Sequence, residues 1–89
     1  MKAVITVLGK DRVGIIAGIT AVLAESSVNI LDISQTILQD YFTMIMITEL
    51  PEDQLALPEL AERLQARGDE LGVQVRVQHE AVFSAMHRI

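Results

Sequence analysis

Two segments of this 89-residue sequence are apolar on both faces, and this feature constrains the fold most strongly. The segment 2–8 is rich in β-branched residues and stops at Gly9 without alternating between apolar and polar positions. The segment 42–50 has the side-chain period of a strand, but both of its faces are apolar. Strands without a polar face are covered on both sides, so we expect these two in the middle of a sheet.

The segments 29–39 and 73–78 each have one apolar and one polar face. The apolar positions are Leu31, Ile33, Ile37, Val73, Val75 and Val77, and the polar positions between them include Asp32, Ser34, Thr36, Gln74, Arg76 and Gln78. This alternation is typical of strands with one face in solvent, so we expect both at the edges of the sheet. Residues 39–41 predict a hairpin turn between the second and third strands.

Two helices are expected, one after the first strand and one after the third. Apolar residues at helical spacing within 15–23 predict the first, with Asp11 as its N-cap. Pro58 suits the first turn of the second helix, and Gly72 suits its end. Residues 81–89 predict a short C-terminal helix.

The order β-α-β-β-α-β predicts an α+β fold, the ferredoxin-like sandwich, as a single domain over residues 1–89. In that fold a four-stranded antiparallel sheet carries two helices on one face. We expect the other face to carry Phe42, Met44 and Met46. A single copy would expose this apolar patch, so we expect a homodimer or a larger homo-oligomer.

The composition excludes several kinds of partner and site. The net charge of −5 disfavours binding to nucleic acid. The absence of cysteine excludes disulfides, zinc knuckles and thiol catalysis, and it fits a cytoplasmic protein. The longest apolar stretch, residues 13–24, is shorter than the roughly 20 residues that a membrane span needs, so we expect no membrane partner.

The ferredoxin-like sandwich hosts several functions, and each requires particular residues. A copper chaperone needs paired cysteines, and an RNA-recognition domain needs aromatic residues on the central strands; neither set is present. An acylphosphatase-like hydrolase remains a less favoured alternative, because Arg12 and Asn29 only loosely match its requirements. His79 and His87 lack the spacing of metal ligands and are expected on the surface. We therefore expect no catalytic residue, no metal site and no cofactor.

The loop from Lys10 to Gly14 is the candidate binding site. Amides at a helix N-terminus attract a carboxylate, and Gly14 would let a ligand approach the backbone. Asp11 could pair with an ammonium group, so the loop offers what a free amino acid requires. The residue types also allow a purely structural interpretation, in which Asp11 only caps the helix and Gly14 only packs.

Three stretches of the sequence resemble the ACT domain family. Residues 11–19 read D-R-V-G-I-I-A-G-I, residues 29–35 read N-I-L-D-I-S-Q, and residues 70–77 read E-L-G-V-Q-V-R-V. The resemblance covers nearly the whole chain. It is greatest to the small stand-alone ACT proteins of bacteria and archaea, and it extends more distantly to the paired ACT domains of the glycine cleavage system repressor.

The resemblance implies a regulatory domain, not an enzyme, that binds an amino acid where two subunits meet. The ligand would lie between the first loop of one subunit and the start of the second strand of another. The implied ligand-binding residues are Asp11, Arg12, Val13, Gly14, Asn29 and Ile30. The output would pass through homo-oligomerisation or a partner protein. The alternative is a structural protein–protein interaction module that binds no ligand.

Overall fold

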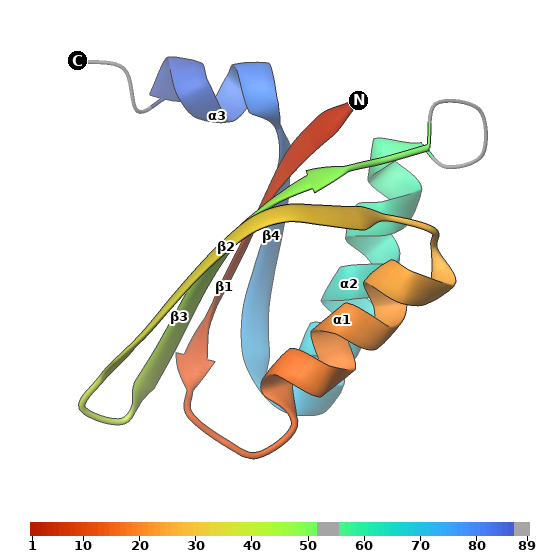
Figure 1. Cartoon of the computed structure of the whole chain (residues 1–89). Helices are drawn as coiled ribbons and strands as arrows, with labels where there is room; N and C mark the ends of the chain where they lie inside the picture. Colours follow the sequence, from red (N-terminus) through yellow and green to blue (C-terminus); the bar gives the residue numbers. More distant parts are fainter. Residues whose placement is uncertain (52–55, 87–89) are drawn as a thin grey trace.

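The computed structural model describes residues 1–51 and 56–86, and Figure 1 shows how their helices and strands are arranged. The elements are β1 (Lys2–Lys10), α1 (Ile15–Glu25), β2 (Asn29–Leu38), β3 (Tyr41–Glu49), α2 (Leu57–Leu71), β4 (Val73–His79) and α3 (Glu80–Met86). The antiparallel sheet has the order β2-β3-β1-β4. This order confirms the predicted ferredoxin-like sandwich, with β1 and β3 central and β2 and β4 at the edges. Residues 87–89 of the predicted C-terminal helix lie outside the described residues.

The core lies between the sheet and the pair α1 and α2, which cover one face of the sheet (Figure 1). Phe42, Met44 and Met46 belong to this core, with exposed fractions of 4%, 0% and 0%. The prediction that they lie on the open face is therefore wrong. Both faces of β3 are apolar, so its own pattern could not indicate which face the helices cover. The register places Ile5 opposite Met46 and so joins the apolar faces of the two central strands.

The open face of the sheet is more polar than predicted. Thr6 lies opposite Ile45 on one side and Arg76 on the other, and Leu8 lies between polar neighbours in the same way. Leu8 and Ile45 are 47% and 39% exposed. Apolar and polar side chains are therefore mixed on this face.

The helix α3 covers part of the open face. Gln78 lies opposite Val4, and its side-chain amide donates a hydrogen bond to the sulfur of Met86 at 3.1 Å. Val4 is only 3% exposed, although it lies on the face away from α1 and α2. The imidazole Nδ1 of His79 accepts a hydrogen bond from the Ala81 N–H at 3.0 Å. His79 is thus an exposed residue, as predicted, and it also caps the first turn of α3.

The chain turns from α1 into β2 through a Schellman motif. The Val28 N–H donates to the Leu23 carbonyl at 2.9 Å, and the Ser27 N–H donates to the Ala24 carbonyl at 3.1 Å. Ser27 has the left-handed backbone conformation, with φ at 59°, at the position where glycine is usual. The turn brings Val28 onto Leu23 in the core, which fixes where β2 begins.

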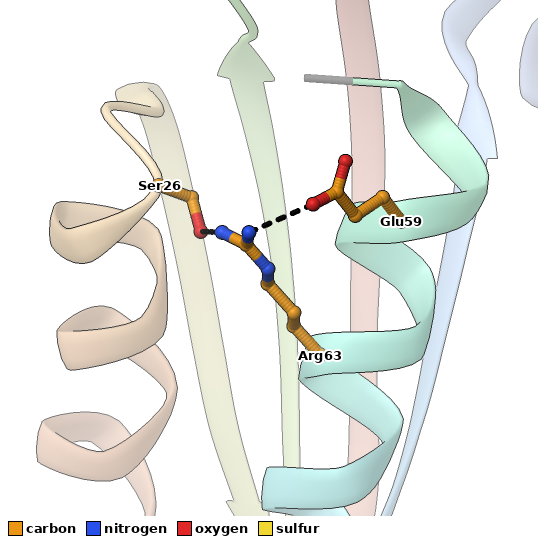
Figure 2. Close-up of polar contacts among 3 residues, drawn as sticks. All are labelled: Ser26, Glu59 and Arg63. Atoms are coloured by element: carbon orange, nitrogen blue, oxygen red, sulfur yellow. Dashed lines mark hydrogen bonds and ion pairs between the residues drawn. The ribbon is translucent and has the colours of Figure 1, made fainter. Parts of the chain in front are cut away.

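A polar contact ties the end of α1 to α2, as Figure 2 shows. The guanidinium of Arg63 donates to the hydroxyl of Ser26 at 3.0 Å and to the carboxylate of Glu59 at 2.8 Å. Ser26 is only 7% exposed, so its hydroxyl needs a partner within the protein. This contact holds the residues immediately before β2 in place.

We expect Ser27→Gly to raise the free energy of unfolding by about 0.5–1 kcal/mol. A left-handed conformation costs a residue with a Cβ atom roughly 1–2 kcal/mol, and the flexibility of glycine in the unfolded chain offsets about half of the gain. Urea denaturation measures the change. Ser27→Ala keeps the Cβ atom and should give no increase. Equal urea midpoints for the glycine and alanine variants would contradict a left-handed backbone at Ser27.

Candidate functional site

The candidate site begins at the loop between β1 and α1, where Gly14 has a backbone conformation that favours glycine. Its φ is 96° and its ψ is 0°, within the left-handed region. An ideal Cβ atom on Gly14 would meet no heavy atom within 4 Å. The interpretation that Gly14 only packs is therefore wrong, because glycine here is required by the backbone and leaves open space beside it.

The first turn of α1 carries no side-chain cap. Gly14 is at the N-cap position, no side chain accepts a hydrogen bond from the first turn, and that turn contains no acidic residue. The prediction that Asp11 caps this helix is wrong, because α1 begins at Ile15, too far along the chain from Asp11. The amides at the start of α1 therefore have no side-chain acceptor and lie as donors at the positive end of the helix dipole. Such an arrangement can bind a carboxylate.

The loop before α1 is anchored on two sides. The Asp11 N–H donates to the carbonyl of Asp40, in the turn of the β2–β3 hairpin, at 2.7 Å. The guanidinium of Arg12 donates to the carbonyl of Leu71, at the end of α2, at 3.2 Å. A cation is stabilised at that position because the helix C-terminus carries partial negative charge. Arg12, predicted as a ligand-binding residue, thus has a partner within the chain.

The remaining predicted site residues differ in their surroundings. Val13 is 98% exposed and lies at the surface beside Gly14. Asn29 is exposed and Ile30 is partly buried at the start of β2, immediately before a β-bulge. The loop and the start of β2 lie at opposite ends of α1, a helix that is about 16 Å long. One chain consequently does not bring the two halves of the predicted site together.

Two backbone groups at the site were not found by sequence reasoning. The carbonyls of Asp40 and Leu71 hold the loop, but a backbone acceptor is present at every residue and leaves no mark in a sequence. Among residues 1–51 and 56–86, no group of three or more histidine, cysteine or acidic residues could hold a metal ion. No described helix is both long enough and apolar enough to cross a membrane.

We expect Arg12→Gln to loosen the loop while changing the free energy of unfolding by less than about 1 kcal/mol, because the lost contact is exposed. Hydrogen exchange of the amides in residues 11–17 should become faster. Lys10→Gln is the matched control, since it removes one positive charge from the same segment without touching α2. Equal exchange rates in the two variants would contradict an anchoring role for Arg12.

Comparisons with known proteins agree with this fold. A family model described as the ACT domain matches residues 2–78. A UPF0237 protein of Methanopyrus kandleri is 56% identical over 88 residues, which span 99% of this chain and 98% of the relative. The solved structure of an ACT domain protein from Streptococcus pneumoniae is 42% identical, with a TM-score of 0.83 over 98% of both chains.

A more distant structure, assigned provisionally as a glycine cleavage system transcriptional repressor, is 20% identical. Its TM-score is 0.77 over 89% of this chain and 47% of that one, and the likeness shows a shared fold alone. The family model and the two similar proteins agree over nearly the whole length of the sequence. This chain belongs to the ACT domain family.

Proposed function

We propose that this chain is a regulatory domain that binds a free amino acid between two copies of itself and carries out no catalysis. The observation that carries the proposal is the uncapped N-terminus of α1 behind Gly14. A loop anchored to both the β2–β3 turn and the end of α2 keeps these amide donors in a fixed position. Donors that are fixed before binding lose little conformational entropy when a ligand arrives.

The chemistry of the loop suits both ends of an amino acid. The carboxylate would accept hydrogen bonds from the first amides of α1, next to the space beside Gly14. The ammonium group would pair with the carboxylate of Asp11, which makes no hydrogen bond or ion pair with other described residues. The Asp11 amide is already bonded to Asp40, so the orientation of this residue is restrained.

The outer edge of β2 supports an interface between two copies. β2 is an edge strand of 10 residues, and its side chains include several exposed apolar ones. These are Leu31, Ile33, Ile37 and Leu38. A long apolar edge strand left in solvent is a site for pairing with another chain. Pairing around a two-fold axis would cover this edge in both copies.

Antiparallel pairing of β2 with itself would complete the site. Over the full strand, Asn29 of the partner subunit would lie opposite Leu38. Leu38 directly precedes the turn whose Asp40 carbonyl holds Asp11, so this end of β2 lies near the loop. The start of the partner's β2 would therefore approach the loop that one chain alone leaves incomplete.

Regulation would then proceed through assembly or through a partner protein. We place the protein in the cytoplasm, because its sequence has no cysteine to form disulfides. A ligand held by both copies stabilises the dimer by mass action. The same apolar edge would also serve a structural interaction module that binds no ligand, which is the second candidate function. Measurements of ligand binding and of assembly separate the two.

A thermal-shift screen of the twenty amino acids tests ligand binding. At ten times its dissociation constant, a ligand stabilises the folded state by about 1.4 kcal/mol, or roughly 6–11 °C for a domain of this size. Asp11→Asn removes the carboxylate with little change in shape and should abolish the shift. Glu62→Gln, on the exposed side of α2, should retain it. If no amino acid raises the melting temperature of the wild type at about 10 mM, amino-acid binding is excluded.

Sedimentation of Ile33→Lys tests the interface. Ile33 is 44% exposed on β2, and a lysine there would place a charge in the paired edge. We expect the dissociation constant of the dimer to rise by roughly tenfold or more, which corresponds to about 1.4 kcal/mol. Val82→Lys alters an apolar residue on α3 that is 52% exposed, and it should leave the dimer intact. A dimer that survives Ile33→Lys and dissociates with Val82→Lys would place the interface elsewhere.

A further inference from the structure

The second edge of the sheet carries a groove that the proposed function does not use. β4 ends the sheet opposite β2 and pairs only with β1. A groove of about 790 Å³ follows it, and residues 73–78 all line this groove. Gln65 and Asp69 of α2 border one side, and Phe83 and Met86 of α3 border the other. Figure 1 shows α2 beside β4 and α3 at its end.

One part of the lining is the outer edge of β4, with unpaired backbone groups, and another is the open sheet face at Thr6, Leu8 and Ile45. Among the described residues, the backbone of β4 hydrogen-bonds to β1 and to no further strand. Its seven residues span about 23 Å. An extended peptide of similar length could pair with this edge and satisfy its amides and carbonyls. The outer edge of β4 is therefore available to a strand.

The charge of the groove indicates which strand it would accept. Arg76 is the central residue of β4 and projects on the open face of the sheet, opposite Thr6. Within residues 1–51 and 56–86 its guanidinium makes no hydrogen bond and no ion pair. The neighbouring residues on that face, Gln74 and Gln78, are neutral. A carboxylate opposite Arg76 would supply the missing partner.

A second copy of this chain fits the edge poorly. If β4 paired with itself over its whole length, Arg76 would face Arg76 of the partner subunit. Like charges directly opposite each other destabilise an antiparallel pair. Charged side chains on edge strands also prevent edge-to-edge association in natural sheets. The β4 edge thus differs from the β2 edge, which is apolar along much of its length.

We propose that β4 binds an extended segment of a partner protein as a fifth strand, with an acidic residue of that segment opposite Arg76. Neighbouring residues of a strand point to opposite faces, so the residues flanking the acidic one would face α2. Gln65 and Asp69 line that side and favour basic side chains. The partner segment therefore has an acidic residue between two basic ones, and the amino-acid site has no part in recognising it.

Binding of designed peptides to the full chain tests this proposal. The probes are three capped peptides, T-V-K-E-K-V-T and its variants with Gln or Lys at the centre. We expect the wild type to bind the Glu-centred peptide at least about tenfold more tightly than the Gln-centred one, a difference of about 1.4 kcal/mol. Arg76→Glu should prefer the Lys-centred peptide. The control Lys10→Glu has the same net charge as Arg76→Glu, and it should bind the three peptides as the wild type does.

The design separates a specific contact from general attraction. The chain is acidic, so non-specific binding would favour the Lys-centred peptide in every variant. Two results would overturn the proposal. One is that the wild type prefers the Lys-centred peptide, and the other is that it binds no peptide at millimolar concentration. Changes in the NMR spectrum should centre on residues 73–79, and changes centred on β2 would likewise overturn it.

Hydrogen exchange without peptide distinguishes a partner segment from a second copy. About half of the amides of an unpaired edge strand point away from the sheet, so they should exchange rapidly in wild-type β4 and slowly once the Glu-centred peptide binds. Slow exchange of these amides without peptide would mean that another copy already covers the edge, and the proposal would be wrong.

Discussion

The packing of β1 against β3 under the two long helices holds the rest of the domain in place. Backbone pairing puts Ile5 opposite Met46, and the larger side chains that these two strands place on this face are buried. The helices must lie close, because aromatic side chains make up only 3% of the sequence and cannot fill wide gaps. Gly68 permits this closeness: a Cβ atom there would lie 2.8 Å from a methyl group of Val75 and 2.9 Å from the carbonyl oxygen of Val73. A domain this small has little other buried surface to compensate for a loss of contact here.

The architecture was predictable because strand and helix periods differ and because central strands lack a polar face. The face of β3 that the helices cover was not predictable from β3 itself, since apolar residues occupy both sides. Thr6 is the one polar residue within 3–8, and it marks the face of β1 that the helices leave open. Because Thr6 lies opposite Ile45, this pairing of β1 with β3 places Ile45 on the open face and the methionines in the core.

The candidate site was only partly predictable. Gly14 was found from its residue type and its place before a helix, and its positive φ gives a reason for glycine there. Asp11 was misassigned as a helix cap, because a capping side chain and a loop carboxylate look alike in a sequence. The contacts that position the loop join residues far apart in the chain and use backbone carbonyls. The distance between the loop and Asn29 also required the fold, since residues near each other in sequence can lie at opposite ends of a helix.

The hydrogen bond between the Asp11 amide and the Asp40 carbonyl would directly link the two proposed events, ligand binding and subunit pairing. One residue later the chain passes into the part of the loop proposed to bind the ligand, and Asp40 closes the hairpin that contains the edge proposed to pair. A loop that moves when a ligand binds must pull on the hairpin, and a hairpin held by a second copy must restrain the loop. If both proposed events occur, affinity for the ligand and affinity between subunits would change by the same factor, in both directions. An amino acid and a second subunit would act on this domain as reciprocal effectors, with one peptide hydrogen bond as the connection.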